Sequence, residues 1–546
     1  MTVMPQRRAP RGQMNDELIQ QRRWMILGVL VLSLLVVVLD TSILNVALKR
    51  LSEPKPAGLG ATQSQLEWAT NAYTLAFAGL LFSWGVLGDR VGRKRVLLAG
   101  LVAFGVSSLL SAYSQTPDQL IIARALMGIS GAAVLPSTLS IISNVFAPHE
   151  RAKAIGIWAG AVGLALAIGP ITGGILLAHF WWGSVFLVNV PIVIVALALM
   201  FVIVPDSRDP KPGRLDPIGV GLSIVGITVF VYGIVRGGDV GWGTPEVWLE
   251  LFGGVALLGG FLAWERRVSS PILDLTLFRS RSFSAAVAVI TLVFFAFMGL
   301  VFFLSFYLQA ARGFSPLQSG LLLLPLAAGQ LFFSSRSANL VARFGAKRMT
   351  AGGLLLMTVA FGYYVRAGAH SPIWLLEVVL FLEGAGIANV MPPSTSAIMA
   401  SVPREKAGQG SAIGNTMRQL GGALGVAVLG SILSSAYRTS ITPHLKQIPA
   451  LAHNPADLQT VSSSITSTLS FAAHAGTAGH TLTAPAISAF IGAMHDAAAA
   501  SVVVGIIGIV VALRWLPGRV RSVAPVQPEV AAADEYPTSD RVLVQA

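Results

Sequence analysis

The chain has 546 residues, of which 54% are hydrophobic and only 12% are charged, and its formal net charge is +13. Soluble globular chains carry about 25% charged residues, so this composition excludes an ordinary soluble protein and indicates a membrane protein. Cysteine is absent, which excludes disulfides, thiol catalysis and thiolate metal sites.

Apolar runs of about 20 residues, each long enough to cross a bilayer core of about 30 Å, recur along the chain. We therefore expect an all-α membrane protein with fourteen transmembrane helices. The first run has full spanning length and no small-residue cleavage site, so we do not interpret it as a secretory signal. The expected spans are 25–47, 66–87, 96–114, 118–142, 153–177, 182–204, 217–236, 247–265, 283–310, 316–340, 349–366, 372–400, 408–436 and 496–516.

Lys and Arg are distributed unevenly between the two sides of these spans. If the N-terminus lies inside the cell, most of the 38 basic residues fall in cytoplasmic segments. This asymmetry follows the positive-inside rule and predicts that both termini are cytoplasmic. It also accounts for the basic net charge, so we expect no nucleic-acid partner.

A charged turn occurs twice in the chain. The stretch "DRVGRKRV" at 89–96 and the stretch "ARFGAKRM" at 342–349 share an Arg, a Gly, a Lys and an Arg, whereas Asp89 is replaced by Ala342. Both turns follow an even-numbered span on the cytoplasmic side, which predicts two parallel six-helix repeats plus two intervening helices. The expected units are an N-terminal tail 1–24, a first half 25–204, intervening helices 217–265, a second half 283–516 with a long outer loop 437–495, and a C-terminal tail 517–546.

Six motifs occur in order along the chain, in or at the end of six of the expected spans. They are "LDTSILNVAL" (39–48), "GVLGDRVGRK" (85–94), "RALMGISGA" (124–132), "GLALAIGPITGG" (163–174), "WGSVFLVNVPI" (182–192) and "NTMRQLGGALGVAVLG" (415–430). In these motifs and their order, the chain resembles the major facilitator superfamily, and more narrowly the fourteen-span drug:proton antiporters of bacteria. The motif at 182–192 is most similar to that of exporters of quaternary-ammonium biocides and dyes. Those exporters commonly carry Asp where this chain has Asn71 and Gln330, which makes divalent organic cations less expected substrates.

The resemblance implies a proton-coupled multidrug efflux transporter that exports amphiphilic, often cationic compounds by alternating access. It implies a multi-pass, monomeric protein of the bacterial plasma (inner) membrane, with protons, small drugs, dyes or lipid-like substrates and membrane lipids as partners. A lipid or metabolite exporter on the same scaffold is the alternative. A channel or sensor would need a continuous pore or a signalling domain. No phosphate loop, catalytic triad or metal-ligand spacing occurs in the sequence, so we expect neither an enzyme nor a cofactor.

Three polar residues are predicted to lie at one depth in the first half. At a rise of about 1.5 Å per residue, Asp40 lies about 22 Å and Arg124 about 21 Å above the inner face of the core. Asn71 reaches a similar height from the other side. Burial disfavours an ionised carboxylate and a neighbouring guanidinium favours it, so we expect the Asp40 carboxyl group to exchange a proton, with Arg124 as its partner in proton coupling. A fixed ion pair or helix cap is the alternative.

The first charged turn is predicted to be a conformational latch between two helices. Glycines permit a tight turn there, and Asp89 can cap a neighbouring helix or pair with Arg93. The alternative is an anchor that only fixes the topology at the anionic leaflet. The latch residues are Gly88, Asp89, Arg90, Gly92, Arg93 and Lys94.

Two further sets of residues complete the prediction. The expected substrate cavity is lined by Asn71, Tyr73, Gln330, Glu383 and Arg418. Glu383 and Arg418 each lie about 15 Å deep, from opposite sides, and could pair with each other or face the cavity. The motif "GLALAIGPITGG" at 163–174, which we call the fifth-helix motif, is expected to supply close packing and a kink that would block proton leak. Ordinary helix packing is the alternative. Its residues are Gly169, Pro170, Gly173 and Gly174.

Overall fold

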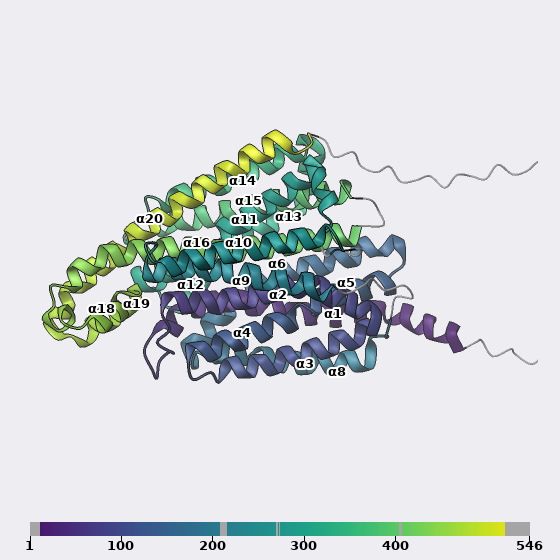
Figure 1. The fold of residues 1–546 in the computed structure, drawn as a ribbon. Helices are drawn as coiled ribbons and strands as arrows, with labels where there is room; N and C mark the ends of the chain where they lie inside the picture. Colours follow the sequence, from purple (N-terminus) through teal and green to yellow (C-terminus); the bar gives the residue numbers. More distant parts are fainter. Residues whose placement is uncertain (1–10, 208–215, 269–270, 272, 403–406, 519–546) are drawn as a thin grey trace, which may run out of the picture.

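The computed structural model describes residues 11–207, 216–268, 271, 273–402 and 407–518. Within these ranges every regular element is a helix and no strand occurs. The beginning of α1 (Arg11–Ser52) and the end of α20 (Gly476–Trp515) lie at one end of an elongated bundle (Figure 1). We call this end the tail end. The opposite end, where α18 (Pro455–Ser462) and α19 (Ile465–His474) lie, is the loop end.

The first half of the chain folds into α1 and seven further helices. Two expected spans are interrupted, at 118–142 by the turn before α5 and at 182–204 by the turn before α8. Pro136 lies in the first turn of α5, where its missing N–H leaves no helical hydrogen bond unmade. The seven helices are α2 (Gln63–Val91), α3 (Arg93–Ala112), α4 (Pro117–Gly131), α5 (Val134–Val145), α6 (Pro148–His179), α7 (Ser184–Leu187) and α8 (Asn189–Ile203).

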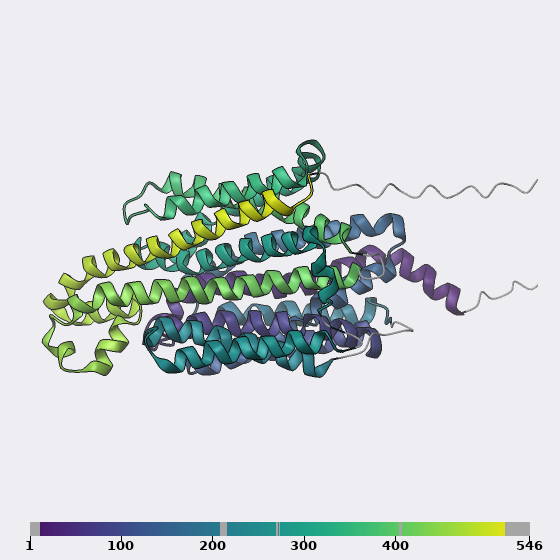
Figure 2. The same cartoon turned by 45° about the horizontal axis from the view of Figure 1, so that its top comes forward.

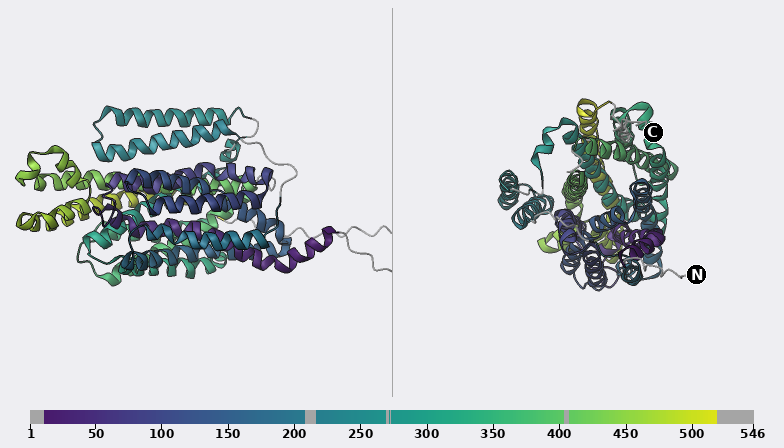
Figure 3. Two further views of the ribbon diagram at one scale, coloured as in Figure 1. Left: turned by 90° about the horizontal axis from the view of Figure 1, so that it is seen from below. Right: turned by 90° about the vertical axis from the view of Figure 1, so that its right-hand side faces the viewer.

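A hairpin of two helices, α9 (Pro217–Val240) and α10 (Pro245–Glu265), separates this half from the second one and lies at the edge of the bundle (Figure 3, left). The second half begins with a short 3-10 helix, η1 (Leu275–Arg279), and ends with α20. Its other elements are α11 (Arg281–Phe306), the π-helical turn η2 (Tyr307–Ala311), α12 (Pro316–Leu322), α13 (Leu324–Phe344), α14 (Ala346–Tyr364), α15 (Ile373–Ala400), α16 (Ala407–Leu445) and α17 (Pro449–Ala452), followed by α18 and α19.

The helices have the length and surface of membrane spans. Among the described residues, 12 helical segments are long and apolar enough to cross a membrane. Large apolar side chains such as Ile194, Phe201 and Leu249 are exposed on the outside of the bundle, as expected of a surface that faces lipid. The predicted all-α membrane fold is therefore confirmed. The count of fourteen spans, with α6 and α14 as the other two, stays a prediction.

The segment 437–495, expected as a long outer loop, is largely helical in the structure. Helix α16 continues to Leu445 and α20 already begins at Gly476, so both extend past the other helices at the loop end (Figures 1 and 2). Both stretches are too polar to be assigned to a span. In the extension of α20, 476–495, several Ala residues favour helix. The extension of α16, 437–445, contains no Ala and continues the helix of its span. The connection between them contains α17, α18 and α19, of which α18 and α19 pack against each other.

The two halves contact each other toward the loop end. Helix α2 packs against α16, and α6 packs against α12. The second contact is very close, because a Cβ atom at Gly174 would lie 2.7 Å from the Cα of Leu317. Gln309 of η2 also donates a hydrogen bond of 2.9 Å to the carbonyl of Val46 in α1. Helix α9 packs against both α2 and α16, so the hairpin spans the junction of the halves.

The hairpin offers a test of this packing. A Cβ atom at Gly254 would lie 2.6 Å from the backbone nitrogen of Phe230, whereas one at the neighbouring Gly253 would meet no atom within 4 Å. Gly254→Val should therefore push α10 from α9 and cost about 1–3 kcal/mol. Thermal unfolding in detergent should show a lower midpoint for this variant than for the control Gly253→Val. Equal midpoints for the two variants would contradict the close contact between α9 and α10.

Candidate functional site

The most deeply buried charged contact joins α1 to α4. Arg124 donates from Nη1 to Oδ2 of Asp40, and both side chains are 1% exposed. The second carboxylate oxygen accepts a 3.0 Å hydrogen bond from Asn189 of α8. Arg124 also donates from Nε to the carbonyl of Ala69, at 3.1 Å. A buried ion pair is tolerated when hydrogen bonds satisfy its remaining groups, as they do here on both carboxylate oxygens.

Helix α2 holds the guanidinium in place. The ring of Tyr73 lies 4.4 Å from the Arg124 guanidinium carbon, a cation–π contact. The Tyr73 hydroxyl donates to the carbonyl of Val37 at 3.4 Å. Gly128 allows α4 to come this close to α2, because a Cβ atom at this position would collide with the backbone carbonyl of Tyr73. The site thus depends on a glycine one turn after Arg124.

Counting along the helices predicts this ion pair correctly, but not its third member. The Asp40–Arg124 contact is confirmed. Asn71 is fully buried, yet neither of its side-chain polar atoms has a hydrogen-bond partner among the described residues. It therefore does not belong to the hydrogen-bonded group around Asp40.

Asn189 takes the place expected for Asn71. Besides bonding Asp40, its amide donates to Ser108 of α3 at 3.1 Å. Ser108 in turn donates to the carbonyl of Phe186 at 2.8 Å. The signal for Asn189 was present in the sequence, since it is an isolated amide within the otherwise apolar stretch "VFLVNVPIVIV".

The charged turn between α2 and α3 makes several contacts at the tail end. Arg93 pairs with Asp89 at 2.9 Å, which is one of the two possibilities that the sequence leaves open for Asp89. The backbone nitrogen of Arg93 donates to the carbonyl of Ser207, and Lys94 donates to that of Phe201, both at 2.9 Å. The turn is therefore attached to the end of α8 as well as joining α2 to α3.

The two glycines of this turn have different surroundings. Gly92 has a φ of 122°, which L side chains rarely adopt. A Cβ atom at Gly88 would lie 3.8 Å from the hydroxyl of Ser137, so α2 lies beside α5 at this point. Arg90 is exposed on the same turn.

In the second half, Glu383 and Arg418 do not form the pair that was one of the two predicted possibilities. Glu383 is fully buried in α15, and neither carboxylate oxygen has a hydrogen-bond partner among the described residues. Arg418 of α16 lies with its guanidinium carbon 5.4 Å from the ring centre of Phe294. Gln330 is partly buried on α13, and its backbone nitrogen lies 2.9 Å from where a Cβ atom of Gly384 would be. Gln330 and Glu383 thus lie on adjacent helices.

The fifth-helix motif packs α6 between the two halves. Cβ atoms at Gly169 and Gly173 would contact Ser42 and Ile43 of α1, and one at Gly174 would contact Leu317 of α12. Pro170 lies inside α6, and its carbonyl faces Gly320 of α12. The close packing expected of this motif is therefore present.

One buried acid was missed by the sequence prediction. Glu67 is 1% exposed in α2, at the junction with α16, and both of its carboxylate oxygens lack a hydrogen-bond partner among the described residues. The available signal was its position at the start of the span 66–87. A position so close to the end of a span indicates a residue at the membrane interface, so the sequence alone does not predict that Glu67 is buried.

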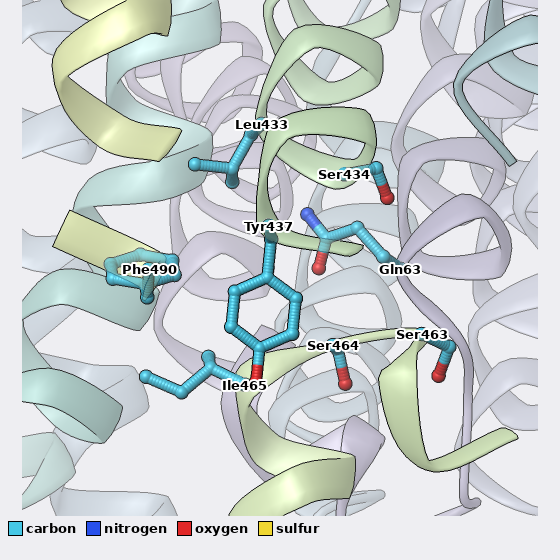
Figure 4. A pocket seen from close by; sticks show the side chains of 8 residues that line it. All are labelled: Gln63, Leu433, Ser434, Tyr437, Ser463, Ser464, Ile465 and Phe490. Carbon is cyan, nitrogen blue, oxygen red and sulfur yellow. The ribbon is translucent and has the colours of Figure 1, made fainter. Parts of the chain in front are cut away.

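Two cavities lie at the loop end. The smaller, of about 10 Å³, is lined by residues of α2, α16, α20 and the α18–α19 connection (Figure 4). The larger, of about 510 Å³, lies between the α1–α2 connection and α19, and includes Lys49, Glu53 and His474. No group of three or more His, Asp or Glu residues that could hold a metal ion occurs in the part of the chain that the structure describes.

Comparison with curated proteins finds close relatives over most of the chain. The "Multidrug efflux pump LfrA" of Mycolicibacterium smegmatis is 35% identical over 77% of this chain and 82% of its own length. The "Tetracenomycin C resistance and export protein" of Streptomyces glaucescens is 34% identical over 76% of each chain. The "Methyl viologen resistance protein SmvA" of Salmonella typhimurium is 34% identical over 77% of this chain and 84% of its own.

Solved structures share the fold at low sequence identity. A bacterial homologue of the human lysosomal transporter Spinster, in an inward-facing and occupied conformation, has a TM-score of 0.63 at 16% identity and covers 90% of this chain and 96% of its own. A D-xylose–proton symporter has a TM-score of 0.58 at 14% identity and covers 91% and 98%. The family description "Major Facilitator Superfamily" matches residues 30–426. With these relatives, the match shows that the chain belongs to the Major Facilitator Superfamily of multi-pass membrane transporters.

Proposed function

We propose that this transporter exports amphiphilic, often cationic drugs from the bacterial cytoplasm in exchange for protons. The observation that carries the proposal is the Asp40–Arg124 pair, an ionisable contact that is 1% exposed within a membrane-spanning half. Ionisable residues at this depth are expensive and mark substrate or proton pathways. Related proteins bear names of efflux pumps and resistance proteins for several unlike compounds, which supports drugs as the substrate class.

The orientation follows from charge. The basic turn 88–95 lies at the tail end, together with the beginning of α1 and the end of α20. By the positive-inside rule, the tail end is cytoplasmic and the loop end is outside the plasma (inner) membrane. The contacts between α2 and α16 and between α6 and α12 would then close the outer side.

Asp40 is proposed to exchange the proton. While it is ionised, Arg124 and Asn189 satisfy both of its oxygens. When it takes up a proton, the attraction that holds Arg124 weakens, and the guanidinium must find other partners or move. Proton binding therefore changes the contact that joins α1 to α4. A cationic substrate that approaches Asp40 would compete with the proton for the same charge.

The energy available is sufficient for export. A membrane potential of about 100 mV provides about 2.3 kcal/mol per charge, and one pH unit provides about 1.4 kcal/mol. Exchanging one proton for a neutral drug uses both contributions. Exchanging one proton for a monovalent cation is electroneutral and uses only the pH difference.

In the second half, Glu383 is a buried carboxyl group without a hydrogen-bond partner among the described residues, and it would select for cations.

The first prediction tests the proton carrier. Asp40→Asn should abolish substrate-induced proton release while some substrates still bind, because the amide cannot ionise. The release is measured with a pH dye in weak buffer on purified protein. Asp457→Asn, an exposed acid of α18, is the control and should release protons normally. Unchanged release from Asp40→Asn would show that the proton is carried elsewhere.

The second prediction concerns the latch. Asp89→Asn weakens a partly exposed pair worth about 0.5–1 kcal/mol, so the balance between conformations should shift about two- to fivefold, with little loss of folded protein. Transport should slow at normal expression. The control is Arg95→Gln, because Arg95 is largely exposed and contacts Asp206 only at 3.4 Å. Parallel losses of expression and transport in Asp89→Asn would support the anchor that only fixes topology.

The third prediction concerns charge selection. Glu383→Gln removes a carboxyl group that is buried without a hydrogen-bond partner among the described residues and would ionise only when a cation binds beside it. The change should therefore reduce export of a monovalent cationic dye more than export of a neutral drug of similar size. Efflux of both compounds from the same cells gives the ratio. Glu377→Gln is the matched control, since Glu377 lies on the same helix but is partly exposed nearer the loop end. Equal loss for both compounds would mean that Glu383 is structural.

A further inference from the structure

We propose that Glu67 is a second proton-binding site, at the junction of the two halves, and that its protonation is required for closure of the loop end. The proposal rests on the proposed function only in taking the loop end as the outer side. Glu67 lies on α2 five residues after the N-cap Thr62 and is 1% exposed. Its carboxyl group is in contact with Gly430 of α16, where an added Cβ atom would collide with it. The acid of one half is therefore covered by the backbone of the other.

An ionised carboxylate is not compatible with this position. Both oxygens of Glu67 lack a hydrogen-bond partner among the described residues. A buried charge that is neither paired nor hydrogen-bonded costs several kcal/mol, so such a group takes up a proton instead. In the closed arrangement Glu67 is therefore neutral. When the halves separate at the loop end, water reaches the carboxyl group and the ionised form becomes accessible.

The charges around Glu67 favour the same outcome. On α9, Asp239 lies beside the same turn of α2, where its carboxylate accepts a hydrogen bond of 3.4 Å from Ser64. Asp239 is itself held by Arg438 of α16 at 2.7 Å, so this cation is already paired. The other titratable or charged groups on the elements packed against this part of α2 are Tyr232 and Arg236 of α9, Tyr437 of α16, and Asp118 and Arg124 of α4.

Polar groups lead from Glu67 toward the loop end. Gln63 is one helical turn before Glu67 on α2, and Ser434 is one turn after Gly430 on α16. Both line the small cavity of about 10 Å³, together with Ser463 and Ser464 (Figure 4). The amide nitrogen of Gln63 and the hydroxyl of Ser434 are buried and have no hydrogen-bond partner among the described residues. The cavity has room for about one water molecule, which could bridge these groups. Polar groups of α2 and α16 thus lie between Glu67 and the α18–α19 connection at the loop end.

The proposal makes closure dependent on pH in a defined direction. The closed state holds the proton on Glu67 more firmly than the open state, so it binds more protons and is favoured at low pH. Glu67 ionises at a lower pH in the open state than in the closed state. Between these two pH values, the ratio of closed to open protein should fall about tenfold per pH unit. This dependence involves no substrate.

The experiment measures the distance across the loop end. The chain has no cysteine, so Tyr113→Cys at the end of α3 and Thr439→Cys on α16 provide two exposed spin-label sites on opposite halves. Double electron–electron resonance is recorded from pH 5 to 9 on the full chain in lipid nanodiscs without substrate. The parent should change from the short to the long distance as pH rises. Glu67→Gln, which stays neutral, should keep the short distance throughout.

Matched variants separate the proposal from a general loss of structure. Glu67→Asp should restore a pH-dependent change, and Glu246→Gln, an exposed acid of α10, should behave as the parent. Gly430→Ala should favour the long distance at every pH, because the added methyl group would collide with the Glu67 carboxyl group. In the double variant Gly430→Ala, Glu67→Ala this collision is removed, so the effect should be cancelled. A distance in Glu67→Gln that titrates as in the parent would overturn the proposal, as would a parent distance independent of pH. Asp40→Asn should leave the titration in place, so failure of Asp40 as carrier and failure of Glu67 are distinguishable.

Discussion

A charge in the middle of a bilayer must be paired, and the contact between Arg124 and Asp40 meets this requirement with groups from five helices. Asp40 comes from α1 and Arg124 from α4, while α2 contributes the Tyr73 ring and the Ala69 carbonyl. Helix α8 supplies Asn189, which in turn is bonded to Ser108 of α3. Because each partner satisfies another, a change in the protonation of Asp40 would affect hydrogen bonds that involve five helices of the first half.

The two buried carboxyl groups of this half differ in their surroundings, and this suggests different tasks. Asp40 is hydrogen-bonded on both oxygens and lies within one half. Glu67 has no partner among the described residues and lies against the opposite half. A bonded acid can keep its charge when buried, whereas an unbonded one must be neutral. In our account protons and substrate compete for Asp40. Glu67 instead binds a proton when the outer side closes and can release it when that side opens.

The sequence predicts the helical membrane fold and the principal ion pair because both depend on simple counting. Hydropathy and length identify the spans, and a fixed rise per residue places Asp40 and Arg124 at one depth. Counting does not give the rotation of a helix about its axis. For this reason Asn71 was expected beside the pair that Asn189 completes, and pairing of Glu383 with Arg418 stayed open although the structure does not contain it. Likewise, Glu67 lies near a helix end in sequence, and only the packing of α16 shows that it is buried.

The extent of the outer connection was misjudged for a related reason. Hydropathy reports where a helix leaves the apolar core, not where it ends, so α16 and α20 extend beyond the stretch that composition assigns to the membrane. Their extensions place α18 and α19 beyond the end of the bundle (Figure 1). A composition that is too polar for a span therefore still permits a helix, and in the α20 extension its Ala residues favour one.

Export of drugs in exchange for protons is the central claim, and transport by purified protein in lipid vesicles tests it most directly. Uptake of a small panel of cationic and neutral amphiphilic compounds, with phospholipids included, is measured with and without an imposed pH gradient. The account predicts that the gradient drives accumulation of several unlike drugs and that Asp40→Asn removes the gradient-driven part. Transport that is indifferent to the gradient, or confined to the phospholipids, would contradict it.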